Sequence, residues 1–256
     1  MASSHQVQPG SQKPQKKKYL GPKLPETRDE WFEGDRLFVV LEMASLETVK
    51  TRKGYELLNS EDHHGILHKA ASKSNLKVDV SMYRPDIVHQ ALLALLDSPL
   101  NKAGKLKIFI HTQKNVLIEV NPKLRIPRTY NRFAGLMVQL LYQFRIKAKN
   151  SNEKLLKIVK NPITNHLPPN APIFGTSKTG QLIDVHEWVP SNYINKTFTK
   201  GKPVVLVFGA HPHGKIQGAD DYIDDANWIA VSQYALSSAA AISRTLNGFE
   251  KYWNVL

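Results

Sequence analysis

VVLVFGAHPHG, residues 204–214, is the stretch that decides the fold class. Its first five residues are aliphatic or aromatic without a polar interruption, which is typical of a strand in the middle of a parallel sheet covered on both faces. The run ends at Gly209, and a short segment rich in glycine and histidine follows. A glycine loop at the carboxyl end of such a strand lets a flat ligand approach the backbone closely. The stretch therefore predicts an α/β fold with a ligand-binding loop at this sheet edge.

Other predicted elements alternate along the chain around this strand, which is the pattern of an α/β domain. Short apolar runs predict strands at residues 36–42, 105–110 and 116–120, the last two as a hairpin. Helical spacing of apolar residues, capping signals or small-residue content predict helices at 59–72, 87–96, 133–144, 151–159 and 235–246. We expect residues 1–34, which are polar and contain several prolines, to be a disordered basic tail, and residues 35–256 to form a single domain.

The composition excludes several kinds of chemistry. The chain of 256 residues contains no cysteine, so disulfides, cysteine zinc sites, iron–sulfur ligation and a cysteine nucleophile are absent. No apolar run approaches the roughly 18–20 residues that a membrane-spanning helix needs, so no membrane partner is expected.

Positive charge is concentrated in one central block. The formal net charge of the chain is +13, and residues 102–160, with 14 basic and 2 acidic residues, hold +12 of it. A polyanionic partner is the natural interpretation, because each phosphate that a cation neutralises releases a condensed counterion. A lysine-rich solvated surface is the alternative.

The glycine loop resembles a phosphate-binding P-loop, but only in part. Gly209–Lys215 matches the spacing G-x-x-x-x-G-K, and the next residue is Ile216. A P-loop needs a serine or threonine there, since that hydroxyl binds magnesium, so we do not predict an NTPase. No Gly-x-Ser-x-Gly motif surrounds the serines near residue 237, so a serine hydrolase is also disfavoured.

Histidine pairs raise the question of a metal site. A metal needs a third or fourth ligand placed by the fold, and nothing adjacent in the sequence supplies one, so we predict ordinary surface or capping histidines and no metal. The residues concerned are Asp62, His63, His64, His68, His211 and His213.

Two groups of arginines have spacing suited to binding an anion. Arg84 stands before Pro85 and Asp86 at a predicted helix start, where an aspartate two residues on can hold the guanidinium rigidly. Arg125, Arg128 and Arg132 follow one another at intervals of three and four residues in a loop that enters a helix. This spacing can aim several guanidinium groups at one phosphate path. A salt-bridged surface loop is the alternative, although the block contains few acids.

Several long stretches of the chain closely resemble the small-subunit rRNA pseudouridine N1-methyltransferase family, a ribosome-biogenesis branch of the knotted SPOUT methyltransferases. The resemblance covers residues 35–256 and leaves the tail outside. It rests on VVLEMASLETVK, RPDIVHQALLALLDSPLNKAGKL, IEVNPKLRIPRTYNRFAGLMVQLL, EKLLKIVKNPITNHLP and YALSSAAAISRTL.

The resemblance implies a homodimeric SPOUT-type fold with a C-terminal trefoil knot that binds S-adenosylmethionine through its knot loops, with the NPITNHLP loop beside the ligand. It implies that Arg84 is catalytic, that Asp86 orients Arg84, and that Arg84, Arg125, Arg128 and Arg132 contact rRNA. The implied cofactor-binding residues are Thr176, Gly209, Gly214, Val231, Ser232, Gln233, Tyr234, Ala235 and Leu236. The family usually has a proline at the position of Ala235, which is a departure within the third loop.

The activity that the resemblance implies is methyl transfer to N1 of a pseudouridine in small-subunit rRNA, in the nucleus and nucleolus, together with pre-ribosomal assembly factors. No covalent intermediate is needed, because the ring nitrogen can attack the sulfonium methyl directly once its proton is lost. Positioning and electrostatic stabilisation are expected to supply the catalysis. Two alternatives stay open: a mainly non-catalytic rRNA-binding assembly factor, and an enzyme that methylates a ribose 2′-hydroxyl.

Overall fold

The computed structural model describes residues 24–73 and 79–255. Its helical segments are α1 (Arg28–Trp31), α2 (His64–Lys73), η1 (Val80–Met82), α3 (Pro85–Asp97), α4 (Pro99–Lys102), α5 (Tyr130–Gln143), η2 (Ile163–His166), α6 (Val185–Ile194), η3 (Asp225–Asn227) and α7 (Ser238–Tyr252). Its strands are β1 (Leu37–Ala44), β2 (Thr48–Thr51), β3 (Gly54–Leu57), β4 (Leu106–Thr112), β5 (Leu117–Val120), β6 (Arg145–Lys147), β7 (Lys154–Val159), β8 (Ile173–Leu182), β9 (Val204–Gly209) and β10 (Trp228–Ala230).

Eight strands form one mixed sheet in the order β10-β8-β9-β1-β4-β5-β7-β6, and β2 and β3 form a separate hairpin. The five strands from β10 to β4 are mutually parallel, whereas β5, β7 and β6 continue the sheet with antiparallel pairs. The predicted α/β class is confirmed, with a central and mostly parallel sheet. The strand 204–208 lies next to β1 in that parallel part, as its apolar run predicts.

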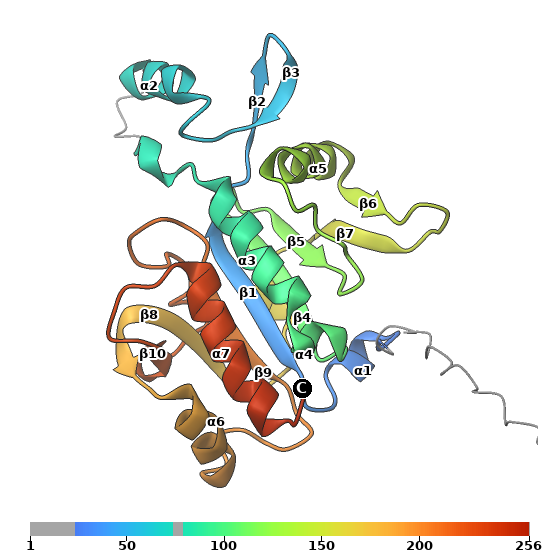
Figure 1. Cartoon of the computed structure of the whole chain (residues 1–256), viewed down its shortest axis with the longest axis vertical. Helices are drawn as coiled ribbons and strands as arrows, with labels where there is room; N and C mark the ends of the chain where they lie inside the picture. Colours follow the sequence, from blue (N-terminus) through green and yellow to red (C-terminus); the bar gives the residue numbers. More distant parts are fainter. Residues whose placement is uncertain (1–23, 74–78, 256) are drawn as a thin grey trace, which may run out of the picture.

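The two faces of the sheet are covered in different ways. Alternate residues of β1, such as Leu37 and Leu41, pack under the helices α3 and α7, which lie side by side in Figure 1. The intervening residues Phe38 and Val40 face α1, η2 and the segment between β9 and β10. Side chains on successive strand positions point to opposite faces, so one apolar strand serves both cores. The face of the sheet toward Phe38 and Val40 is therefore covered by short helices and irregular backbone.

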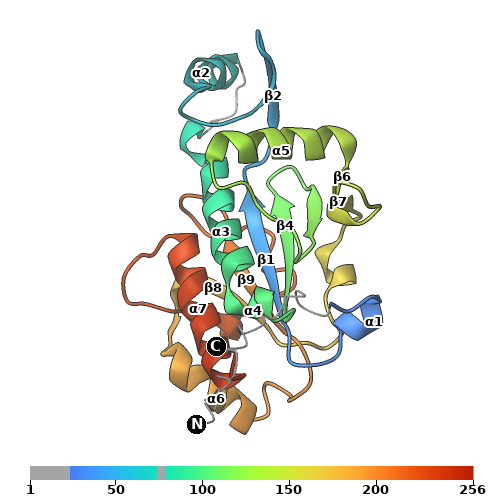
Figure 2. The ribbon, with the colours of Figure 1, turned by 45° about the vertical axis from the view of Figure 1, so that its right-hand side comes forward.

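Helix α5 lies across one end of the sheet, from the side of α3 toward β6 (Figure 2). Phe133, Met137 and Leu140 on its inner face are buried in the main core. The helix ends at Gln143, and the left-handed backbone of its C-cap residue Phe144 turns the chain into β6. The central basic block, residues 102–160, thus forms the strands β4 to β7 and the helix α5.

Close approach of β8 and β10 depends on two glycines. A Cβ atom at Gly175 would lie 2.4 Å from the Trp228 ring, and one at Gly180 would lie 2.6 Å from the Trp228 backbone. Neither distance is tolerated by real side chains, so any larger residue here would push β10 away from the sheet.

Two predictions about local structure are wrong. Residues 151–159 were expected to form a helix, but Lys154–Val159 is strand β7, which pairs with β5 and β6. The predicted tail extends too far, because α1 lies within it and Trp31 is buried against Phe38. Residues 1–23 of that tail lie outside the described residues. The helix predicted at 235–246 begins at Ser238, with Ser237 as its N-cap.

Within residues 24–73 and 79–255, no helix is both long enough and apolar enough to span a membrane.

Candidate functional site

The carboxyl ends of the parallel strands meet at one edge of the sheet, where ligands of open α/β sheets usually bind. At this edge Glu42 of β1 lies beside Gly209 of β9, and the Ala210 amide donates to the Glu42 carbonyl at 2.7 Å. A Cβ atom at Gly209 would lie 2.8 Å from the His211 ring. At Gly209, the last residue of β9, any larger residue would therefore have to displace the His211 ring. Gly214 closes the loop with a φ of +98°, which an L residue rarely adopts.

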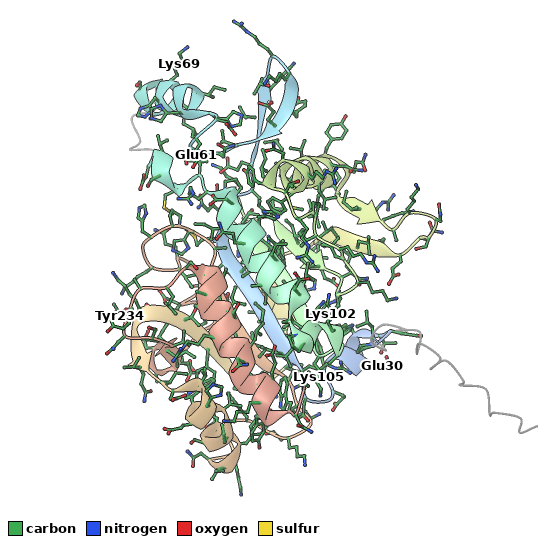
Figure 3. The ribbon with its side chains drawn as sticks, viewed as in Figure 1. Glu30, Glu61, Lys69, Lys102, Lys105 and Tyr234 are labelled. Carbon is green, nitrogen blue, oxygen red and sulfur yellow. The ribbon has the colours of Figure 1, made fainter. Side chains whose placement is uncertain are left out.

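A second loop, residues 231–237, leaves β10 beside this glycine loop. The Ser238 hydroxyl at the start of α7 donates to the Gly209 carbonyl, so the two loops are tied together. Among the described residues, the backbone amides of Gln233, Ala235 and Leu236 have no hydrogen-bond partner. The 231–237 loop thus offers free backbone donors beside an open glycine loop. Figure 3 shows Tyr234 of this loop at the surface of the molecule, where its side chain is 70% exposed.

Thr176 lies in β8, and its hydroxyl donates to the Val207 carbonyl at 3.1 Å. The fold therefore already uses the hydroxyl proton of Thr176, which leaves the hydroxyl oxygen as an acceptor for a ligand. The segment 161–169 begins at the same sheet edge, where the Asn161 side chain donates to the Asn115 carbonyl at 2.7 Å. Ile163 and Leu167 then anchor it to the second core.

Arg84 and Asp86 form the paired contact that their spacing predicts. The Arg84 Nε donates to one Asp86 oxygen at 2.8 Å, and Nη2 donates to the other at 2.7 Å. These hydrogen bonds raise the pKa of Arg84. Two parallel bonds fix the plane of the guanidinium group, while 41% of the Arg84 side chain stays exposed for a ligand.

The segment before Arg84 contacts the glycine loop. His213 Nε2 lies 3.0 Å from a carboxylate oxygen of Asp79, five residues upstream of Arg84. This exposed pair links the loop after β9 to the helix start that carries the Arg84 guanidinium.

His89 brings the arginine loop onto α3. Its Nε2 lies 2.7 Å from the Pro127 carbonyl oxygen, and its ring stacks on Phe133 at 4.6 Å. Tyr130 lies beside both rings, and burial, with the charge of Asp86 as a second cause, raises its pKa to about 12. The loop 124–130 is therefore held against the helix that begins beside Arg84.

The three arginines of this loop differ in their partners. Arg128 makes a bidentate ion pair with Asp97 at the end of α3. The side chains of Arg125 and Arg132 are exposed and make no ion pair or hydrogen bond with any described residue. The alternative of a salt-bridged surface loop thus applies to Arg128, because its partner Asp97 lies outside the block that contains few acids.

Sequence reasoning missed a buried network at the carboxyl edge. The Glu42 side chain is 4% exposed. One of its oxygens accepts from the Tyr222 hydroxyl at 2.6 Å, and the other lies 2.8 Å from His111 Nδ1. The bond to Glu42 raises the pKa of His111. A glutamate at the end of an otherwise apolar strand was the available signal, since a buried carboxylate requires partners. The network holds the segment after the glycine loop onto the sheet.

The described residues contain no group of three or more potential metal ligands. His64 and His68 contact each other with 2.9 Å between their Nε2 atoms, and His63 lies 3.2 Å from Glu56. His211 lies in the glycine loop, where partial burial lowers the pKa of its imidazole.

Sequence comparison assigns a class to this fold and site. The model of the EMG1/NEP1 methyltransferase family matches residues 39–250, and the chain belongs to that family. Ribosomal RNA small subunit methyltransferase NEP1 of Homo sapiens is 47% identical over 224 residues, which are 87% of this chain and 84% of the human protein. The Nep1 protein of Pyrococcus furiosus is 35% identical over 63% of this chain and 69% of its own length.

A solved structure shares the fold. The crystal structure of Archaeoglobus fulgidus Nep1 bound to S-adenosylhomocysteine superimposes with a TM-score of 0.66. The match covers 86% of this chain and 99% of that one, at 24% sequence identity.

Proposed function

We propose that this chain transfers a methyl group from S-adenosylmethionine to N1 of a pseudouridine in small-subunit rRNA. Membership in a methyltransferase family and relatives named as rRNA small subunit methyltransferases support the reaction class. The observation that carries the proposal is the rigid Arg84–Asp86 pair, which stands next to the arginine loop and is linked to the glycine loop. The site therefore has an oriented cation, phosphate-binding cations and a ligand loop on neighbouring elements.

The residues at the carboxyl edge fit an adenosine-type cofactor. The loops 209–214 and 231–237 present glycine backbone and free amides, which suit an adenine ring and an amino-acid moiety recognised by backbone groups. We assign cofactor binding to Gly209, Gly214, Thr176 and the loop residues Val231, Ser232, Gln233, Tyr234, Ala235 and Leu236. When bound, the cofactor supplies an electrophilic methyl group on sulfur.

The arginines act on the RNA. Arg84, oriented by Asp86, shapes the base pocket and stabilises the negative charge that spreads onto the ring oxygens when N1 loses its proton. Arg125 and Arg132 bind phosphates directly, while Arg128 does so after its pair with Asp97 opens. Catalysis then rests on positioning and electrostatics, without a covalent intermediate.

We also propose that the domain is knotted and acts as a homodimer together with pre-ribosomal assembly factors in the nucleus and nucleolus. Exposed apolar side chains on and beside the 231–237 loop support the dimer: Leu182 is 58% exposed, Tyr234 70% and Leu236 41%. Such a group of exposed large apolar residues is the composition of an interface core. Light scattering of the purified chain tests the dimer.

Calorimetry with S-adenosylmethionine, followed by mass spectrometry of digested product RNA, tests the proposed reaction. Cofactor binding and a methyl group on the pseudouridine base are the expected results. A methyl group on the ribose would contradict the base specificity. RNA binding without cofactor binding would contradict the enzyme and favour a non-catalytic assembly factor, for which the departure at Ala235 would be the first residue to examine.

A further inference from the structure

The outer face of α5 forms a continuous exposed stripe with an unusual composition. Its exposed residues recur at helical spacing, and the helix contains no acidic residue. From Arg132 to Tyr142 the stripe is about 15 Å long, at 1.5 Å per residue. Its members are Asn131, Arg132, Gly135, Gln139, Tyr142 and Gln143.

Two aromatic rings at the end of this stripe point into solvent. Tyr142 is 78% exposed and Phe144 65% exposed. Within the described part of the chain, neither ring stacks on another ring or lies under a cation. Single exposed apolar side chains are ordinary, whereas neighbouring ones that form a contiguous patch mark an interaction site.

The backbone conformation at Phe144 makes phenylalanine an unusual residue at this position. Its φ of +63° and ψ of −4° place it in the left-handed region, at the helix end where glycine or asparagine is usual. The conformation is fixed on both sides, because the Phe144 amide donates to Leu140 at 2.7 Å and its carbonyl accepts from Ile158 at 2.9 Å. Phenylalanine here strains the backbone and exposes its ring, so the fold does not require it.

The surroundings of the two rings are positively charged. Arg132 lies on the same stripe and Arg145 follows Phe144, and neither makes an ion pair with a described residue. Both acids of the 102–160 block are already occupied: Glu119 pairs with Lys107 and Lys157, and Glu153 pairs with Lys123. Exposed aromatic rings among uncompensated arginines are the arrangement that binds single-stranded nucleic acid.

We infer that the outer face of α5 is a binding track for the single-stranded RNA that flanks the modified nucleotide. Arg132 and Arg145 contact its phosphates, and Tyr142 and Phe144 stack on unpaired bases. This inference rests on the proposed function, because it extends the rRNA substrate beyond the nucleotide that reacts.

The test compares an RNA hairpin with and without a single-stranded flank, for the wild type and for Tyr142→Ala, Phe144→Gly and the double variant. Phe144→Gly relieves the left-handed strain and so should keep or raise the thermal stability, and Tyr142→Ala should leave it unchanged. Each variant should nevertheless weaken binding of the flanked hairpin by about five- to tenfold, since one stacked base is lost. The slope of affinity against salt should stay the same, because no phosphate contact is removed.

Two control variants test whether the loss of RNA affinity is specific to the rings on the outer face of α5. Tyr142→Phe keeps a ring and should retain affinity. Ile194→Ala removes a side chain that is 77% exposed, at the end of α6 far from α5, and should also retain it. Unchanged affinity of the double variant for the flanked hairpin would overturn the inference and leave the two rings to a protein partner. Failure of the wild type to bind either hairpin would contradict the proposed function itself.

Discussion

Asp86 holds the guanidinium group of Arg84 through two parallel hydrogen bonds, of 2.8 and 2.7 Å, between residues only two positions apart at the start of α3. The pairing fixes the plane of a cation that is still 41% exposed. A lysine at this position would keep the charge but lose the planar bidentate geometry.

Arg84→Lys should therefore lower the rate of methyl transfer by about a hundredfold, the typical effect of losing one oriented donor. The dissociation constant for S-adenosylmethionine should not change. Single-turnover transfer and calorimetry measure the two quantities. Arg52→Lys, at the exposed tip of the β2–β3 hairpin, is the matched control and should behave as wild type. Normal turnover of the Arg84→Lys variant would remove this residue from the mechanism.

Arg125 and Arg132 lack partners among the described residues, so each should contribute fully to RNA affinity. Replacing either with alanine should weaken RNA binding and reduce the slope of log affinity against log salt by about one. Fluorescence anisotropy at several salt concentrations measures this slope. Slopes that stay at the wild-type value would show that both side chains serve the fold.

Asp97→Asn should have the opposite effect. Asp97 neutralises Arg128 in a bidentate pair, and this pairing lowers the pKa of Asp97. Removing the carboxylate frees the guanidinium for a phosphate, so RNA affinity should rise by severalfold at low salt. The same anisotropy titration checks it, and weaker binding by the variant would contradict a phosphate role for Arg128.

Gly209→Ala should weaken binding of S-adenosylmethionine by about tenfold while the domain stays folded, because the new Cβ atom would lie 2.8 Å from the His211 ring and displace the loop. Gly65→Ala in α2 is the control, since a Cβ atom there meets nothing within 4 Å. Calorimetry measures both affinities. Equal affinities of the two variants would exclude the glycine loop from the cofactor site.

The Glu42–His111 pair predicts a pH-dependent stability. The hydrogen bond to Glu42 raises the pKa of His111 in the folded state above its unfolded value of 6.5. The stabilisation is therefore fully present below about pH 6.5 and is lost as the pH rises through the folded pKa. Relative to Glu42→Gln, the wild type should gain about 1 kcal/mol more unfolding free energy at pH 5.5 than at pH 9.

Urea denaturation at the two pH values measures this difference. In a His111→Asn background the pH dependence of the Glu42→Gln effect should disappear, because its titrating partner is gone. If Glu42→Gln changed the unfolding free energy equally at both pH values in the wild-type background, the claim that Glu42 raises the pKa of His111 would be contradicted.

Local patterns predicted the parallel strands β1, β4 and β9 and the helix α3, but not the parallel strands β8 and β10 or the antiparallel strand β7. Leu155, Leu156, Ile158 and Val159 have spacing that fits a helix, yet they form β7, because β5 and β6 lie on both sides of this segment. A short apolar run does not distinguish the two structures by periodicity alone. Trp31 was likewise missed, since one buried aromatic in a polar segment carries no periodic signal.

The contacts of the candidate site also differ in whether the sequence alone predicts them. The Arg84–Asp86 contact was predictable because it is local. The Arg128–Asp97 pair and the Glu42–His111–Tyr222 network join residues 31 to 180 positions apart, so only the fold brings them together.

Methyl transfer from labelled S-adenosylmethionine to two matched hairpins, one with pseudouridine and one with uridine at the same loop position, tests the central claim most directly. The proposed reaction predicts transfer only to the pseudouridine hairpin, because uridine presents no free N1 at the ring position that accepts the methyl group. Equal transfer to both hairpins, or tight binding of both without transfer to either, would contradict it.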